Sequence, residues 1–168
     1  LRLSVNIPAQ LVTDLGFAAR VALALENAGV EGNFITLEIT ETVAMSDPER
    51  SMDVLVQLRE NRIGLAIDDF GMGYSSLKQL YEMPFSELKI HSGFVRELTI
   101  SEEARVIVRA TIDLGHALSM RVCAEGVENL ESLELLEQWG CDTVQGFYFG
   151  MPKPSNEYET WARGHLAS

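Results

Sequence analysis

Apolar residues along the chain follow two alternating patterns: short runs of β-branched and aliphatic residues, and longer segments with a helical period. The short runs predict strands at Leu1–Val5, Ile35–Ile39, Leu65–Ile67, Glu87–Ile90, Arg121–Ala124 and Asp142–Val144. A helical segment follows each run, and no linker or low-complexity tract interrupts the series. This repeated order predicts parallel strands joined by right-handed crossovers, and hence a doubly wound sheet or a (β/α) barrel.

Capping residues predict where the helices begin. The first helix is expected to begin at Pro8 and end near Gly29, and the second to begin at Pro48 after the N-cap Asp47. Further helices are expected after Tyr74, after the capping-box pattern Thr99–Glu102, after Asn129 and around Glu157–Arg163. The helical period predicts the side chains that face the sheet: Leu11, Leu15, Ala18, Ala22 and Leu25 in the first helix, Met52, Leu55 and Val56 in the second, and Val106, Ile107, Ala110, Leu114 and Leu118 after Glu102.

Side chains able to bind a metal ion or a phosphate stand at or just beyond the C-terminal end of every predicted strand: Asn6, Glu38, Asp68 with Asp69, Lys89, Glu125 and Gln145. A doubly wound sheet gathers its ligands at one switch point, whereas a barrel gathers residues from many strands at one mouth. The distribution therefore favours a TIM-type (β/α) barrel. Because a complete barrel has eight strands and about 250 residues, we expect residues 1–168 to be the C-terminal part of a single barrel domain, lacking about two N-terminal βα units.

Composition narrows the classes of function. With 46% hydrophobic and 23% charged residues, the chain fits a globular domain, and disordered, collagenous and disulfide-scaffold classes are excluded. The formal net charge of −12 argues against DNA or RNA binding, so an anionic ligand needs a metal ion or a few well-placed cations. Cys123 and Cys141 lack CxxC spacing and are interpreted as buried free thiols of a cytoplasmic protein. No apolar run reaches the roughly 20 residues of a membrane span, although a longer parent protein could be anchored through other regions.

Two adjacent carboxylates, Asp68 and Asp69, follow a buried apolar strand in LAIDDFGMGYSS and precede a glycine-containing loop. Neighbouring aspartates tolerate each other when divalent cations supply positive charge, and one carboxylate can bridge two ions. The alternative is a hydrated turn in which an aspartate caps the next helix. At this position the residues alone leave both interpretations open.

The remaining candidates are weak individually and stronger together. Glu38 and Glu41 lie three residues apart in LEITE, where in an acidic chain they could be loop acids. Glu125 and Glu128 lie three residues apart in AEGVEN, at another strand end. The ammonium of Lys89 suits carboxylates, a phosphate or an attacking water, or else it extends into solvent. Because so many of these residues end predicted strands, a functional mouth is favoured over coincidence.

Six strings occur in order over nearly the whole chain: LSVN, LEITE, DDFGMGYSSL, LKI followed by FV, AEGVE and QGFYFGMPKP. Lys89 follows Asp68 by 21 residues, and Gln145 follows Glu125 by 20. In these motifs and spacings the chain resembles the EAL family of bacterial cyclic di-GMP phosphodiesterases. The resemblance implies a TIM-type barrel that hydrolyses cyclic di-GMP to linear pGpG with two Mg²⁺ or Mn²⁺ ions.

The resemblance also implies the ligands of the two ions. Asn6, Glu38 and Asp68 would hold the first ion. Asp68 would bridge to a second ion that Asp69 also binds. Glu125 would lie beside that second ion as a ligand or as the general base.

Further roles are implied around the ions. Lys89 would position the attacking water, and Gln145 would support the site through water or phosphate. Glu41 and Glu128 would hold the loop after DDFG in the shape that binds metal and forms a dimer. The resemblance therefore implies a homodimer through the loop after Asp69, in a parent chain that can carry GGDEF or sensory domains.

Two departures from the family pattern bear on activity. The Glu-Ala-Leu motif, whose Glu is a ligand of the first ion, is absent from the sequence. LKIHSGFV stands where the family usually has LKIDRSFV, so His91, Ser92 and Gly93 replace Asp, Arg and Ser. These changes keep open an alternative, a catalytically inactive cyclic di-GMP receptor or a signalling and dimerisation module. A lone histidine is most often a neutral side chain that faces the surface, which is the expectation for His91. An unrelated Mg²⁺ barrel of the enolase type would leave the DDFG and AEGVE strings unexplained.

Overall fold

Six parallel strands form one sheet, and their spatial order is their order in the sequence. The computed structural model describes residues 2–73 and 76–166. The strands are β1 (Leu3–Asn6), β2 (Ile35–Thr40), β3 (Gly64–Phe70), β4 (Glu87–Ile90), β5 (Arg121–Glu125) and β6 (Thr143–Gln145). The strand predictions are confirmed to within three residues at each end, except that Leu1 lies outside the described residues. Within that part of the chain, β1 and β6 each pair on one side only, so the sheet is an open barrel.

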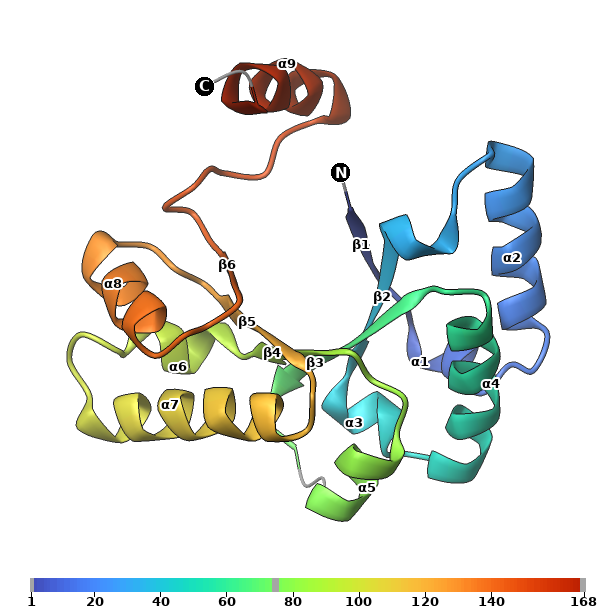
Figure 1. Ribbon diagram of the computed structural model, residues 1–168, viewed down its shortest axis with the longest axis horizontal. Helices are drawn as coiled ribbons and strands as arrows, with labels where there is room; N and C mark the ends of the chain where they lie inside the picture. The colour runs from blue at the N-terminus through green and yellow to red at the C-terminus, as the bar shows by residue number, and fades with distance from the viewer. Residues whose placement is uncertain (1, 74–75, 167–168) are drawn as a thin grey trace.

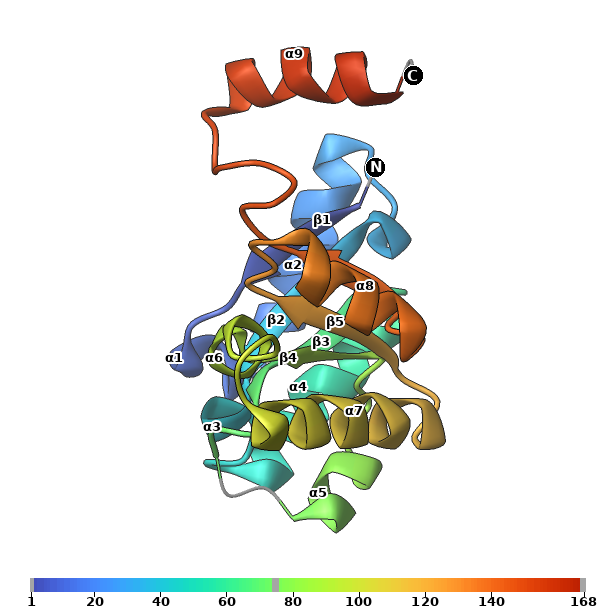
Figure 2. The same cartoon turned by 90° about the vertical axis from the view of Figure 1, so that its left-hand side faces the viewer.

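Helices cover one face of the curved sheet (Figure 1). They are α1 (Ala9–Val12), α2 (Phe17–Ala28), α3 (Glu41–Ala44), α4 (Pro48–Glu60), α5 (Leu77–Glu82), α6 (Ser92–Arg96), α7 (Glu102–Ala117), α8 (Leu130–Gln138) and α9 (Ser155–Leu166), with a 3-10 helix at Gly32–Phe34. α4 packs on β3, and α7 packs on β4 and β5. α9 lies apart from the sheet, at the end of an extended segment, in both views (Figures 1 and 2). In the ranges described, no helix combines the length and the apolar character that crossing a bilayer requires.

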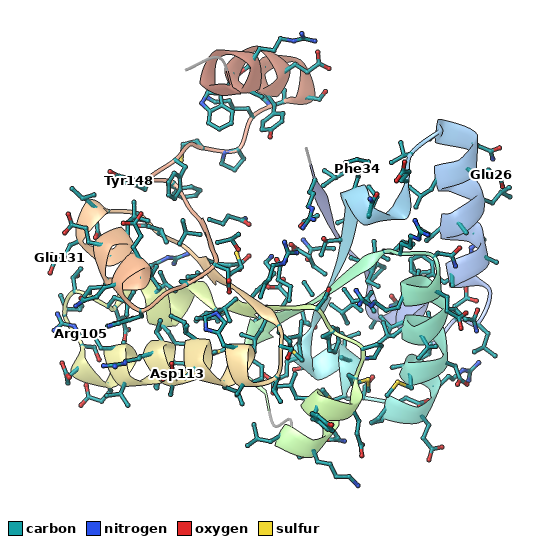
Figure 3. All side chains as sticks on the ribbon, in the orientation of Figure 1. Glu26, Phe34, Arg105, Asp113, Glu131 and Tyr148 are labelled. Atoms are coloured by element: carbon teal, nitrogen blue, oxygen red, sulfur yellow. The ribbon has the colours of Figure 1, made fainter. Side chains whose placement is uncertain are left out.

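The register of the strands separates a polar face from an apolar one. Residues paired in a parallel ladder project from the same face of the sheet, and alternate residues project from the other. Asn6 pairs with Glu38, and Glu125 pairs with Gln145, so these side chains share the face without helices. The opposite face contacts the helices through side chains that are at most 4% exposed: Leu37, Ile39, Leu65, Ile67, Leu88, Ile90 and Val122. Charged side chains such as Glu26, Asp113 and Glu131 lie on the outer surfaces of the helices (Figure 3).

The segment predicted as one helix from Pro8 to Gly29 is two helices, α1 and α2, so that prediction is wrong. The Asp14 carboxylate accounts for the break. Its Oδ1 accepts the backbone N–H of Gly16 at 2.9 Å, and its Oδ2 pairs with Arg20 at 2.7 Å. These bonds stabilise a turn in competition with the helix. Leu15, which was predicted to face the sheet, lies in this turn and is 52% exposed.

The inward face of α7 also differs from the prediction. Val106, Ile107 and Ala110 are exposed, whereas Ala104, Val108, Thr111, Ile112 and Gly115 are buried. A Cβ at position 115 would collide with Cγ2 of Val122, so the helix approaches the sheet where it has no side chain. The steric fit to β5 determines which face of α7 packs on the sheet, and the hydrophobic period of the sequence carries no information about that fit.

Most of the predicted N-caps are confirmed, whereas several side chains predicted to face the sheet are exposed. Asp47 Oδ1 accepts the N–H of Arg50 at 3.3 Å at the start of α4, and Asn129 Oδ1 accepts the N–H of Ser132 at 2.9 Å at the start of α8. In α7 the cap is Ser101, whose side chain accepts the N–H of Ala104, so the predicted reciprocal box is absent there. Val56 of α4, predicted to face the sheet, is 40% exposed.

Asp142 joins the end of α7 to the start of β5. Its Oδ2 accepts the backbone N–H of Val122 at 2.8 Å and lies 2.8 Å from Nε2 of His116. Desolvation alone would raise the pKa of Asp142, but these two bonds outweigh it and hold the pKa below its ordinary value of 3.8.

We predict that Asp142→Asn lowers the free energy of unfolding by about 1 kcal/mol at neutral pH, because a charge-assisted hydrogen bond is weakened. A carboxyl group with a lowered pKa stabilises the fold above its unfolded-state pKa, and this contribution is lost as the pH falls through its folded-state pKa. The difference between variant and wild type should therefore be smaller in acid than at neutral pH. Urea unfolding at pH 7 and at pH 3 measures both values. An equal difference at the two pH values would contradict this assignment.

Candidate functional site

Lys89, near the end of β4, is the centre of the site. Its Nζ lies 2.7 Å from Glu38 Oε2, 2.6 Å from Glu125 Oε1 and 3.7 Å from Asp68 Oδ1. The lysine side chain is 3% exposed, so these contacts lie inside the mouth and not on its surface. The structure therefore brings together residues of β2, β3, β4 and β5 that are as much as 87 positions apart in the sequence. The alternative in which Lys89 extends into solvent does not hold.

Burial and pairing perturb the acids and the base of this cluster. Desolvation would lower the pKa of Lys89, but the hydrogen bonds to Glu125 and Glu38 outweigh it and raise the pKa well above the ordinary 10.5. Lys89 is therefore a fixed positive charge. Desolvation raises the pKa of Glu125 above 4.5, against the opposing effect of the Lys89 ammonium. A carboxyl group with a raised pKa in a polar mouth suits proton transfer.

A β-bulge brings Asp68 and Asp69 to the same site. In a regular strand neighbouring side chains point to opposite faces. The pairing of β3 with β4 shifts register between Ile67 and Phe70, and Asp69 adopts a left-handed conformation with φ 54°. As a result, oxygen atoms of Asp68, Asp69 and Glu125 all lie within 4.8 Å of one another. The three carboxylates are therefore close together in space, which is the arrangement that the cation interpretation requires.

Glu41 holds the loop that follows β3. Its Oε2 accepts the backbone N–H groups of Gly71 at 3.0 Å and of Gly73 at 3.1 Å, although Glu41 lies 30 and 32 positions before them in the sequence. The Glu41 side chain is buried, and a Cβ at position 73 would lie 2.8 Å from its carboxyl carbon. The contact is therefore a close one between α3 and the loop, and it fixes the backbone immediately after Asp69.

Three other predicted site residues lie at the edge of the cluster. Asn6, on β1, and Gln145, on β6, are exposed at the two ends of the sheet, next to Glu38 and Glu125 in register. Glu128 forms an ion pair with Arg96 of α6 at 3.2 Å. Through this contact Glu128 connects to α6, which is a different place from the loop after DDFG where it was expected.

His91 was expected to face the surface, and the structure places it half-buried beside Asp69. It follows β4 directly, is 29% exposed, and its Nε2 lies 3.8 Å from Oδ1 of Asp69. Its position two residues after Lys89, at a strand end, was a signal that it faces the mouth.

The donor set has the chemistry of a site for a hard divalent cation. Such cations bind carboxylate oxygens at about 2.0–2.6 Å, so oxygens that share one ion lie at most about 5 Å apart. The 4.8 Å spread of the Asp68, Asp69 and Glu125 oxygens fits this requirement. Glu38 Oε2 and Asp68 Oδ1 both lie within 3.7 Å of Lys89 Nζ. The residues present therefore fit the implied metal.

Fold and site together define a (β/α)-barrel protein with an acidic cluster, bridged by a lysine, at the C-terminal mouth of the sheet. The EAL domain profile matches residues 1–152. The chain belongs to the EAL domain family.

Similarity to a named bacterial protein, in sequence and in structure, supports this assignment. MucR of Pseudomonas aeruginosa, a bifunctional diguanylate cyclase/cyclic di-GMP phosphodiesterase, is 40% identical over 155 residues, which are 92% of this chain and 23% of MucR. The MucR phosphodiesterase solved with cyclic di-GMP aligns with a TM-score of 0.89 and 39% identity over 94% of this chain and 64% of that one. The chain thus spans less than a quarter of the full length of MucR.

Two further solved structures are similar. The EAL domain of Mycobacterium smegmatis DcpA aligns with a TM-score of 0.90 and 38% identity over 98% of this chain and 74% of that chain. Klebsiella pneumoniae BlrP1, solved with manganese and cyclic di-GMP, aligns with a TM-score of 0.83 and 32% identity over 90% and 39% of the two chains.

Proposed function

We propose that the protein hydrolyses cyclic di-GMP to linear pGpG at the mouth of the barrel, in a reaction that depends on divalent cations. The observation that carries the proposal is the position of Lys89, buried between Glu38 and Glu125 and beside Asp68, in a chain of the EAL family. A cluster of three acids around one buried lysine at the functional end of a barrel suits an anionic substrate that arrives with metal ions. The names of MucR and the complex of its phosphodiesterase with cyclic di-GMP support the choice of substrate.

Two Mg²⁺ or Mn²⁺ ions are part of the proposal. Asn6, Glu38 and Asp68 would hold the first, and Asp68 and Asp69 the second, with Glu125 next to it. When bound, the ions lower the pKa of a water and offset the charge that develops on the phosphate. The manganese in the BlrP1 complex supports the choice of metal.

The side chains of this chain would divide the remaining work. Lys89 orients the attacking water through its ammonium protons, and Glu125, if not itself a ligand, accepts the proton of that water. The water oxygen bonds to phosphorus while one phosphodiester P–O bond breaks, and a proton passes to the departing oxygen. Gln145 supports the phosphate or a water from β6, and Glu41 keeps Asp69 in place through the loop at Gly71 and Gly73.

The proposal extends to the surroundings of the site. We propose that residues 1–168 are the C-terminal part of one barrel domain, because the similar EAL domain of DcpA is longer than the matched chain. A homodimer through the loop after Asp69 and a parent with GGDEF or sensory domains are part of this proposal, although Tyr74 and Ser75 of that loop lie outside the described residues. A cytoplasmic location agrees with the two free cysteines.

The alternative is a receptor that binds cyclic di-GMP without turnover, and His91 beside Asp69 is the observation that favours it. The two functions separate when the longest encoded form of the protein is incubated with cyclic di-GMP. In Ca²⁺, calorimetry measures binding; in Mn²⁺, chromatography measures pGpG. We expect binding in the first and product in the second, with no product in EDTA. Binding without product would establish the receptor. If neither binding nor product were detected, both functions would be contradicted.

A further inference from the structure

His91 has an unusual task at the start of α6, because it is both the N-cap of that helix and a neighbour of Asp69. Its Nδ1 accepts the backbone N–H of Gly93 at 3.0 Å. An imidazole nitrogen that accepts a hydrogen bond carries no proton. The proton of the neutral ring is therefore on Nε2, the atom that lies 3.8 Å from Oδ1 of Asp69.

The hydrogen bond from Gly93 to Nδ1 therefore leaves Nε2 as the ring nitrogen that lies next to Asp69. A metal ion at Nε2 would require the ring proton to move to Nδ1, where it would oppose the N–H of Gly93. With the cap intact, His91 presents an N–H donor to the side of the cluster formed by Asp69. An N–H group competes with a cation for the same carboxylate oxygens, whereas an oxygen acceptor would add to the cation's ligands.

We propose that His91 is a positioning residue that weakens cation binding on the Asp69 side of the site, by presenting Nε2–H to the Asp69 carboxylate where a carboxylate side chain would attract the ion. The inference rests on the proposed cation centre and deepens it. It implies that the cation affinity is lower at the side of the centre next to α6 than at the other side.

A pair of substitutions at position 91 isolates this effect. Asp and Asn both cap helices well, so His91→Asp and His91→Asn should each retain the bond from the Gly93 N–H. The asparagine side chain carries an N–H donor and no charge, while the aspartate side chain adds a negative charge. Asn129→Asp is the matched control, since it adds the same charge at another N-cap, that of α8.

The measurement is a titration of the longest encoded form of the protein with Mn²⁺ alone, followed by the electron paramagnetic resonance signal of the free ion. We expect His91→Asp to lower the Kd for Mn²⁺ roughly tenfold or more, within the range that neighbours of metal ligands typically produce. His91→Asn and Asn129→Asp should bind as the wild type does.

Equal affinities for His91→Asp and His91→Asn would overturn the inference, because a merely structural cap would treat the two alike. A gain of the same size in Asn129→Asp would overturn it by showing a general charge effect, and so would absence of Mn²⁺ binding in all variants. The titration contains no nucleotide, so it is independent of turnover. If His91→Asp binds more tightly but no variant forms pGpG, the inference stands and the proposed function fails.

Discussion

Replacing Lys89 with methionine is expected to lower the free energy of unfolding by about 3–5 kcal/mol when no divalent cation is present. The ammonium is the charge that lies between Glu38 and Glu125, and its side chain is 3% exposed. Methionine fills a similar volume but leaves these acids and Asp68 without that positive charge. The cost of keeping unpaired charges in a poorly hydrated site is the physical reason for the loss.

Urea unfolding of Lys89→Met, with and without Mn²⁺, measures the effect. A cation that binds the folded state alone restores stability in proportion to its concentration over Kd, by about 2.7 kcal/mol at one hundred times Kd. Lys78→Met is the matched control, because Lys78 is 81% exposed and its pair with Glu82 spans 3.6 Å. We expect the control to stay within about 0.5 kcal/mol of the wild type. Equal stabilities of the two variants would contradict the role given to Lys89.

Glu125→Gln is expected to reduce the rate of cyclic di-GMP hydrolysis by about 10²–10⁴-fold, the typical contribution of a general base. Glutamine keeps the size and one acceptor oxygen of the side chain, but it cannot accept a proton from water. It also removes one of the three carboxylates whose oxygens lie within 4.8 Å of one another. A weaker affinity for Mn²⁺ would therefore accompany the loss of rate.

Initial rates of pGpG formation, measured at increasing concentrations of Mn²⁺ up to saturation, separate the two contributions to this loss. A rate restored by more Mn²⁺ identifies Glu125 as a ligand, and a loss that persists identifies it as the base. Glu131→Gln is the control, since Glu131 is exposed on the first turn of α8 (Figure 3). The account would be wrong if Glu125→Gln and Glu131→Gln had the same rate as the wild type.

Features that depend on local chemistry were predictable for this fold. The strands and the caps at Asp47 and Asn129 follow from β-branched runs and from side chains that accept backbone N–H groups. The break at Asp14 was missed because an apolar period continues across it, while the bonds to Gly16 and Arg20 compete with the helix. The face of α7 was missed for a different reason. Its apolar residues surround much of the helix, and the approach of Gly115 to Val122 is a tertiary fit.

The sequence was enough to predict which residues form the candidate site, but not how they are arranged. Strand ends marked Glu38, Asp68, Lys89 and Glu125, since parallel strands bring such positions to one edge. The bulge that places Asp69 beside Asp68 leaves no signal in the order of residues. The proximity of His91 to Asp69 depends on that same backbone conformation, so sequence reasoning could name the residue but not its contact.

Whether the acidic mouth hydrolyses cyclic di-GMP with bound cations is decided by measuring pGpG formation in Mn²⁺ by the wild type and by Asp68→Asn. Asp68 lies 3.7 Å from Lys89 and shares the acidic cluster with Asp69 and Glu125, so its carboxylate belongs to both proposed cation positions. We expect the wild type to convert cyclic di-GMP to pGpG, and Asp68→Asn, equally folded, to form none. Product formation at the same rate by both proteins would contradict it.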